Sequence, residues 1–482
     1  MKQSYIELLE KAAAWIAEHK EEYISELQGL ARIPSVSRAE EAQPGAPFGP
    51  DCRRVLDYML ERGHHYGFDA VDHDGYAVSV SMGDPVDAIG MIAHLDVVPV
   101  GDGWVYPPYG ATYLQEQDVL IGRGVSDNKG AAVTGLFAMR MIRELNWPLK
   151  HGLRLICGSS EETGMQDMKK LLEMSVAFPK MSLVPDAAFP VNYGQKGSVD
   201  AELSIECTGN LIQLDAGSVR NVIPDLAQCA VAVDEETVRQ AIEKLDDELK
   251  QKVTIEACAE GTRIAAHGRS GHAASPDGCV NAIAVLAEAL CKMHILQGSC
   301  QKAIRELAEL TSDAHGVSEG IPYEDEESGK LTLVYGVAHL KNGVLTISAD
   351  SRFCVTLRKT QLVPKLEENW TGRGFDIVHL DATDPFYIPK TDERVVALQE
   401  LYKEVTGRDD EPYTMGGGTY SRVVPNAISF GLGLRGVEHD MSFLPEGHGG
   451  AHGRDEVLFL DNAMTSFRIY AVALAMLDEL NA

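Results

Sequence analysis

Predominantly apolar runs alternate with helix-like segments in the first part of the chain. The apolar runs occupy 87–96, 152–160 and 181–187, and segments with helical spacing lie between them at 129–145 and 166–175. Strands without polar alternation are buried on both faces, as in a mostly parallel sheet covered by helices. Ligands of such sheets bind at the carboxyl ends of the strands. The pattern therefore predicts an α/β domain whose functional residues follow its strands.

A second pattern, in which apolar and polar residues alternate, begins near 198 and continues to about 384. It predicts half-exposed strands at 199–207, 253–258 and 262–268, and helices at 234–251 and 279–293. The stretch 331–355 contains Asn342-Gly343, a strong signal for a hairpin turn. We expect a separate α+β domain with antiparallel pairing.

The first pattern returns after about 385. Helical spacing covers 393–405 and 461–480, and between them lie a glycine-rich loop at 416–422 and an apolar strand at 427–433. The α/β domain is therefore expected to comprise 1–197 and 385–482. An α+β lid domain, 198–384, is expected to be inserted into it.

Composition and charge narrow the class of partner. The 482 residues include 43 Lys and Arg and 72 Asp and Glu, and the formal net charge of −29 disfavours binding to nucleic acid or an anionic membrane. No apolar stretch approaches the roughly 18 residues of a membrane span, and the charged N-terminus does not resemble a signal peptide. Nine cysteines without a CxxC pair indicate reduced thiols. These features predict a cytoplasmic protein that acts on a small molecule.

Two candidate residues close the first apolar run. His94 and Asp96 are two residues apart in extended chain, so their side chains share one face. One of them can bind a metal while the other orients it. The alternative is an ordinary histidine at a strand end, and these two residues alone leave both interpretations open.

Carboxylates occupy the next two loops. Asp127 lies between a glycine-rich turn and a predicted helix, where either it or Ser126 can serve as the helix N-cap. Glu161 and Glu162 follow the run 152–160. Two adjacent carboxylates at the end of a buried strand need a nearby cation to stay ionised, unless their loop is solvated.

Two further candidates complete a ligand set. Asp186 ends the third apolar run, where its alternative role is a turn residue, and His452 lies in a glycine-rich loop with His448 as a rival. Two histidines and three carboxylates on loops after predicted strands suit two divalent ions with one bridging carboxylate. These five are His94, Asp127, Glu162, Asp186 and His452. Glu161 is then a spare carboxylate that can act as a base.

Five segments of the chain, in their order and spacing, resemble the M20 metallopeptidase family. They are HLDVVPVGDGW, GRGVSDNKG, SSEETG, VPDA and GAHGRDE. The long chain is most similar to the PepV-type cytosolic dipeptidases of that family, and the resemblance covers nearly its whole length. It implies a catalytic domain that holds two metal ions and an inserted lid domain.

The resemblance also implies a role for each candidate residue. His94 and Asp186 would bind one ion, Glu162 and His452 the other, and Asp127 would bridge the two. Asp96 would hold the His94 imidazole, and Glu161 would be the general base. A cis peptide bond is implied after Asp127.

In the second domain the resemblance implies that His272, in RSGHAASP, reaches the scissile carbonyl of the substrate. The positions that match substrate-holding residues are Asn221, Arg352, Gly417, Gly418 and Thr419. Their ordinary alternatives are a loop histidine, a turn asparagine, a surface arginine and a flexible loop. Cys354 and Val355 depart from the family pattern, in which proline often follows the segment around Arg352.

These observations predict a metal-dependent enzyme that hydrolyses the amide bond of short peptides, with dipeptides that carry a free N-terminus as the expected substrates. Zn²⁺ is the favoured metal, with Mn²⁺ or Co²⁺ as alternatives. The alternatives for function are an N-acyl amino acid amidohydrolase of the same fold, a non-catalytic metal-dependent binding protein and a structural interaction protein. Because the PepV-like lid is long enough to mimic a partner subunit, a monomer is expected.

Overall fold

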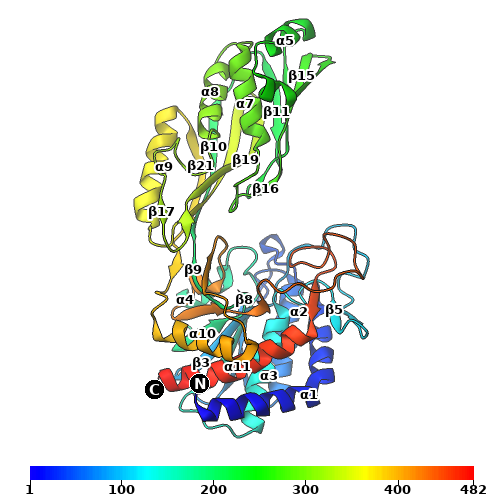
Figure 1. Ribbon diagram of the computed structural model, residues 1–482, viewed down its shortest axis with the longest axis vertical. Helices are drawn as coiled ribbons and strands as arrows, with labels where there is room; N and C mark the ends of the chain where they lie inside the picture. The colour runs from blue at the N-terminus through cyan, green and yellow to red at the C-terminus, as the bar shows by residue number, and fades with distance from the viewer. Residues whose placement is uncertain (482) are drawn as a thin grey trace. The chain divides into compact units, whose positions relative to one another are not determined.

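The computed structural model describes residues 1–481, which form two compact units (Figure 1). Unit 1 contains Met1–Tyr193, Ile388–Tyr413 and the chain from Thr419 onward, and unit 2 contains Gly194–Tyr387 and Thr414–Gly418. Along the chain, unit 2 therefore interrupts unit 1. The sequence placed this insertion at 198–384 and did not indicate that Thr414–Gly418 groups with it.

A mixed sheet forms the centre of unit 1. Its strand order is β1-β2-β6-β3-β7-β24-β9, with bounds Asp69–His73, Ala77–Met82, Gly152–Gly158, Ala88–His94, Met181–Val184, Ala427–Phe430 and Val191–Gln195. The four central strands pair in parallel, whereas β1, β2 and β9 pair antiparallel at the two sides. The predicted α/β class is confirmed, with parallel pairing confined to the centre of the sheet.

Helices cover both faces of this sheet because neighbouring residues of a strand point to opposite faces. On one face, the Met91 side chain lies against Gly135 of α3 (Lys129–Glu144). On the other face, Ile92 packs with Met168 of α4 (Gln166–Glu173). α1 (Gln3–Ala31) and α11 (Leu460–Leu480) pack on α3 and on each other, and α10 (Glu393–Thr406) packs on α11 (Figure 1). α2 (Pro50–His65) packs on β1 and β2.

Two small sheets hold the loops of unit 1. One pairs β8 (Ala187–Phe189) with β25 (Leu432–Leu434), and the other joins β4 (Thr112–Leu114), β5 (Val119–Ile121) and β26 (Val457–Phe459). In the second sheet Val457 pairs with Ile121. This pairing places the segment that follows β5 beside the segment that precedes β26, although more than 300 residues separate them in the sequence.

Unit 2 is built on an antiparallel sheet. Its strand order is β14-β15-β13-β11-β19-β20-β10-β21, with bounds Val253–Cys258, Gly261–His267, Leu226–Val231, Leu211–Ala216, Thr332–Lys341, Val344–Phe353, Gly197–Glu206 and Asp376–Thr383. Every neighbouring pair is antiparallel. The predicted hairpin joins β19 to β20 through Asn342 and Gly343, whose φ angles are +52° and +76°. Both values lie in the left-handed region that Asn and Gly tolerate.

Helices pack on the buried face of this sheet. They are α5 (Glu235–Ile242), α6 (Asp247–Gln251), α7 (Ala282–Met293), α8 (Cys300–Leu310) and α9 (Lys359–Arg373). The prediction of one helix over 234–251 is wrong. Asp246 accepts a hydrogen bond from the Leu249 N–H at 2.9 Å and caps a second helix, so the segment forms α5 and α6. α8 and α9 have no counterpart among the predicted elements.

Among the described residues, no helix combines the length and the apolar composition that a membrane crossing requires.

Candidate metal centre

Candidate ligands of unit 1 lie at or just after the carboxyl ends of the parallel strands. His94 is the last residue of β3, and Asp186 lies two residues beyond β7. Glu161 and Glu162 follow β6, and Asp127 lies in the turn that leads from β5 into α3. Because β6, β3 and β7 are parallel neighbours, their carboxyl ends open at one edge of the sheet.

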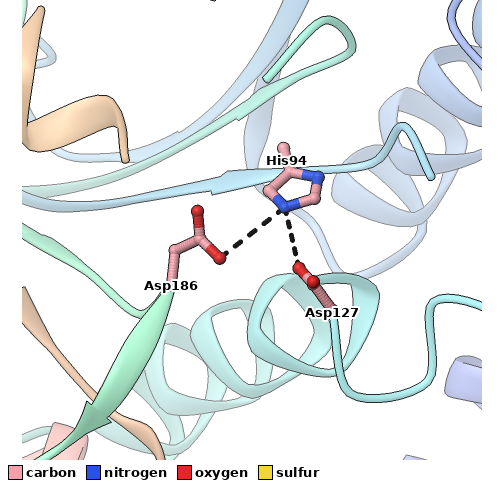
Figure 2. Close-up of side chains that lie close together, drawn as sticks. All are labelled: His94, Asp127 and Asp186. Atoms are coloured by element: carbon pink, nitrogen blue, oxygen red, sulfur yellow. Dashed lines mark hydrogen bonds and ion pairs between the residues drawn. The ribbon is translucent and has the colours of Figure 1, made fainter. Parts of the chain in front are cut away.

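A first cluster consists of His94, Asp127 and Asp186 (Figure 2). The His94 Nε2 atom lies 3.1 Å from Asp127 Oδ1 and 3.7 Å from Asp186 Oδ1. The three ligand atoms lie within 4.8 Å of one another, the spacing at which a single ion can contact all three. Imidazole and carboxylate are donors that suit a divalent transition metal.

A second cluster consists of Asp127, Glu162 and His452. The His452 Nε2 atom lies 2.9 Å from Glu162 Oε1 and 3.0 Å from Asp127 Oδ2. Asp127 therefore belongs to both clusters and directs one carboxylate oxygen into each. A carboxylate placed in this way can contact two ions.

The structure bears on two of the alternatives. The N-cap of α3 is Asn128, and its cap position has no side-chain hydrogen bond, so neither Asp127 nor Ser126 caps this helix. His448, the rival of His452, is bound through Nδ1 to Asp455 at 2.6 Å. The peptide bond between Asp127 and Asn128 is cis, as the sequence resemblance implied.

Mutual contacts perturb the protonation of the ligands. Hydrogen bonds to Asp127 and Glu162 raise the pKa of His452 to about 10. Burial alone would lower the pKa of His94, but the charge of Asp186 and hydrogen bonds to the carboxylates raise it well above its usual value. Burial would raise the pKa of Asp127, yet the hydrogen bonds from the two histidines outweigh it and lower the pKa.

Asp96 supports the site in two ways. The His94 Nδ1 atom lies 3.0 Å from the backbone oxygen of Asp96 and 3.5 Å from its carboxylate. The Asp96 carboxylate accepts hydrogen bonds at 3.1 Å from the backbone N–H groups of Glu161 and Glu162. The carbonyl therefore orients the imidazole, and the carboxylate holds the loop that carries both glutamates.

Glu161 lies next to Glu162 in the chain but belongs to neither cluster. Among the described residues its carboxylate forms no hydrogen bond or ion pair. Burial raises its pKa well above the usual value, and the charge of Asp186 adds to this effect. A carboxylate with a raised pKa and no partner suits a general base.

The donors of the two clusters fit divalent metal ions. Within the described chain, the contacts of their carboxylates involve histidines and neutral groups, with no lysine or arginine among them. Buried carboxylates in such close contact need cations to stay ionised. Within the described chain, protonated histidines are the positive groups that face these carboxylates, and bound metal ions would take the place of their protons.

The sequence of this chain matches the pattern of peptidase family M20/M25/M40 over residues 90–475. The chain belongs to this family. It is similar to "Putative dipeptidase YtjP" of Bacillus subtilis (strain 168), with 28% identity over 467 residues that cover 94% of this chain and 97% of the relative. A protein of the same description from Staphylococcus haemolyticus (strain JCSC1435) is 27% identical, covering 86% and 90%.

Solved structures share the fold of this M20 peptidase. Aminoacylhistidine dipeptidase from Vibrio alginolyticus matches with a TM-score of 0.58 and 17% identity, over 93% of this chain and 95% of that one. The dipeptidase Dug1p from Saccharomyces cerevisiae matches with a TM-score of 0.58 and 13% identity, over 98% of both chains. At these identities the similarity is evidence for the fold alone.

Two of the M20 peptidase's predicted site residues meet in unit 2. His272 lies in β16 (Gly271–His272), which pairs with β12 (Val222–Ile223) so that His272 is opposite Val222. Beside this pair, the Asn221 carbonyl accepts a hydrogen bond from the Ala273 N–H at 2.9 Å. The Ala274 N–H donates to His272 Nδ1 at 3.0 Å. Since Nδ1 is an acceptor here, a neutral His272 carries its proton on Nε2.

Arg352 and Thr419, two further predicted substrate-binding residues, have partners within the protein. Arg352 donates through Nε and one terminal nitrogen to both oxygens of Asp350, at 2.9 and 2.7 Å, which leaves its other terminal nitrogen for further contacts. Thr419 is buried, and its hydroxyl contacts Ser429 Oγ at 2.9 Å. Gly417 and Gly418 belong to the glycine-rich segment that groups with unit 2, whereas Thr419 groups with unit 1.

Sequence reasoning missed several buried residues next to the ligands. Asp167 accepts the N–H groups of Ser159 and Ser160 at 2.7 and 2.8 Å and a hydrogen bond from the Tyr420 hydroxyl. Glu456 and Arg123 form a buried ion pair at 2.8 Å. Glu456 and Arg123 lie inside segments that carry the family resemblance, so a search for charged residues flanking each ligand would have found them.

A cavity of about 430 Å³ borders the second cluster in unit 1. His452 is one of its lining residues, together with Asp102, Glu446 and Arg454. One ligand of the second cluster therefore lies at the wall of a space that small molecules can enter.

Proposed function

We propose that this M20 peptidase hydrolyses dipeptides with a free N-terminus, using two divalent ions. The observation that carries the proposal is that the two oxygens of the Asp127 carboxylate face different histidines. One lies 3.1 Å from His94 Nε2 and the other 3.0 Å from His452 Nε2. The relatives described as dipeptidases, which align with nearly the whole chain, support the choice of substrate.

The residues that would hold the ions follow from the clusters. His94 and Asp186 would bind one ion, Glu162 and His452 the other, and Asp127 both. When bound, such ions lower the pKa of water toward neutrality. Zn²⁺ is our first choice of metal because imidazole and carboxylate donors suit it, and Mn²⁺ or Co²⁺ fit the same donors.

Glu161 moves the proton in the proposed reaction. Its unpaired carboxylate takes a proton from the attacking water as the oxygen adds to the amide carbon. The same proton then passes from Glu161 to the leaving nitrogen as the C–N bond breaks, so the products are one carboxylic acid and one amine. General acid–base catalysis of this kind typically contributes about 100- to 10,000-fold to the rate.

We assign unit 2 a role in substrate recognition. His272 presents an Nε2–H donor, which is the form needed to stabilise a developing oxyanion. Arg352 keeps one terminal nitrogen outside its contact with Asp350, and a guanidinium suits a substrate carboxylate. Asn221 and the glycine-rich segment, Gly417 and Gly418 with Thr419, complete the proposed set.

We also propose that the protein is a monomer. Unit 2 spans Gly194–Tyr387, which is longer than the roughly 100 residues of a small α+β domain. Sedimentation equilibrium should give a mass near 52.4 kDa. A mass near twice that value would contradict the proposal.

The proposed function is tested by amine release from two sets of compounds: unblocked dipeptides and N-acetyl or N-succinyl amino acids. Each set is measured with Zn²⁺, Mn²⁺, Co²⁺ and EDTA. We expect metal-dependent cleavage of the dipeptides alone. Cleavage of the acylated compounds alone would assign the protein to the N-acyl amino acid amidohydrolases. Metal binding without cleavage of either set would indicate a binding protein.

A further inference from the structure

A buried ion pair lies behind the second cluster. Glu456 and Arg123 have relative exposures of 0% and 1%, and Arg123 donates to Glu456 Oε2 at 2.8 Å. Removing two charges from water is costly, so a buried pair of this kind is weak evidence for a gain in stability. Its other contacts indicate what it holds in place.

Glu456 accepts backbone hydrogen bonds from the turn that presents Asp127. Its Oε1 atom accepts the N–H groups of Ser126 and Asp127, both at 2.9 Å, and its Oε2 atom accepts that of Gly124 at 3.0 Å. Three backbone donors on one carboxylate fix both the path of the turn and the position of the Asp127 backbone. The orientation of the bridging ligand therefore depends directly on Glu456.

Arg123 connects the same pair to the other ligand loop. One terminal nitrogen donates to Glu456, and the other donates to the backbone carbonyl of His452 at 3.1 Å. Its guanidinium also lies over the Trp104 ring, 5.2 Å from the ring centre. Arg123 thus ties the His452 loop to the carboxylate that holds Asp127.

We propose that Glu456 and Arg123 are positioning residues that set the distance between Asp127 and His452, and thereby the affinity of the second cluster for its ion. This inference rests on the proposed two-ion site. Neither residue is expected to touch the substrate or an ion. Partners that orient metal ligands typically change metal affinity or activity by about 10- to 100-fold when replaced.

The test compares Glu456→Gln with a matched control, Asp478→Asn. Asp478 is also buried, and its carboxylate accepts two backbone N–H groups, those of Lys150 and His151, at 2.8 and 2.9 Å. These residues precede β6, whereas the ligand loop follows it. Asp478 also contacts His151 Nδ1 at 3.0 Å. The control therefore perturbs a buried carboxylate that holds backbone N–H groups at the opposite end of the strand, about 20 Å away.

Binding is measured by titrating the metal-free proteins with Co²⁺ and recording the visible absorption spectrum, with no peptide present. Glu456→Gln should bind the weaker of its two ions about 10- to 100-fold less tightly than the wild type, with an altered Co²⁺ spectrum. Asp478→Asn should retain wild-type affinity and spectrum, even if its melting temperature falls as far as that of Glu456→Gln. Equal effects of the two substitutions, or no effect of Glu456→Gln, would overturn the proposal.

A second variant covers the case in which Glu456→Gln does not fold. Arg123→Lys keeps a positive charge beside Glu456, but its single nitrogen cannot reach both Glu456 and the His452 carbonyl in the same fork geometry. It should show the same selective loss of affinity for one ion. Wild-type protein that binds fewer than two ions would refute the two-ion site itself. If the variants bind metal more weakly but the wild type cleaves no peptide, the proposed function fails and this inference stands.

Discussion

Asp127 is the residue on which both clusters depend. Its two oxygens face two histidines that come from opposite parts of the chain, His94 and His452. The sequence named all five candidate ligands that the structure brings together in the two clusters, because each follows a strand or a glycine-rich turn. It did not identify the bridging residue without the family resemblance, because a bridge is defined by distances between loops and not by spacing along the chain.

The role of Glu161 is tested by two adjacent substitutions. Glu161→Gln should lower kcat for dipeptides by about 100- to 10,000-fold while both ions still bind, because the carboxylate contacts no ligand. Glu162→Gln is the matched control and should weaken binding of one ion, since Glu162 belongs to the second cluster. Steady-state kinetics and metal analysis of the same preparations separate the two effects. Near-wild-type kcat for Glu161→Gln would contradict the assignment of the base.

Lys129 gives the folded protein a distinct pH dependence. Burial lowers its pKa to about 7, and its amine donates to the Ile33 carbonyl at 2.7 Å. Between pH 7 and its ordinary pKa of about 10.4, the unfolded chain holds a proton there that the folded chain has lost. The free energy of unfolding should therefore rise with pH across this window.

Urea unfolding in EDTA at pH 7 and at pH 10 measures this effect, with Lys129→Met as the reference. The wild type should gain stability relative to the variant as the pH rises, because the cost of burying the ammonium disappears. If the wild type and Lys129→Met differ in unfolding free energy by the same amount at pH 7 and at pH 10, the shifted pKa of Lys129 is contradicted.

At the scale of elements, the sequence predicted most of the central strands and the hairpin, but it missed the Asp246 cap between α5 and α6 and the contacts between distant segments. The apolar runs gave the central strands, and Asn342-Gly343 gave the β19–β20 hairpin. The contacts of Glu456 with the Asp127 turn could not be anticipated, because they require β26 to pair with β5. The contact between Arg352 and Asp350 is local, because residues two apart on β20 share one face, and the sequence analysis did not weigh it.

The hairpin offers a direct test of its turn. Gly343 has a φ of +76°, so Gly343→Ala should lower the free energy of unfolding by about 1–2 kcal/mol, the cost of a left-handed conformation for a residue with a Cβ. Asn342→Gly is the control, since glycine adopts a φ of +52° freely, and it should change stability by less than about 0.5 kcal/mol. Denaturant unfolding measures the free energy of unfolding of both variants. Equal decreases for Gly343→Ala and Asn342→Gly would argue against this turn.

At the scale of the whole molecule, the proposed metal binding and the proposed substrate recognition belong to different units. The described residues of unit 1 include every ligand of both clusters and Glu161, whereas unit 2 carries His272, Asn221 and Arg352. Metal binding should therefore be a property of unit 1 alone. Substitutions in unit 2 should raise KM or lower kcat without changing the number of bound ions.

The Asp127 carboxylate is proposed to serve two ions. Metal titration of Asp127→Asn tests this claim most directly. The wild type should bind two ions per chain. Asp186→Asn and Glu162→Gln should each weaken one of them, and Asp127→Asn should weaken both. A single ion in the wild type, or loss of only one ion in Asp127→Asn, would contradict the claim.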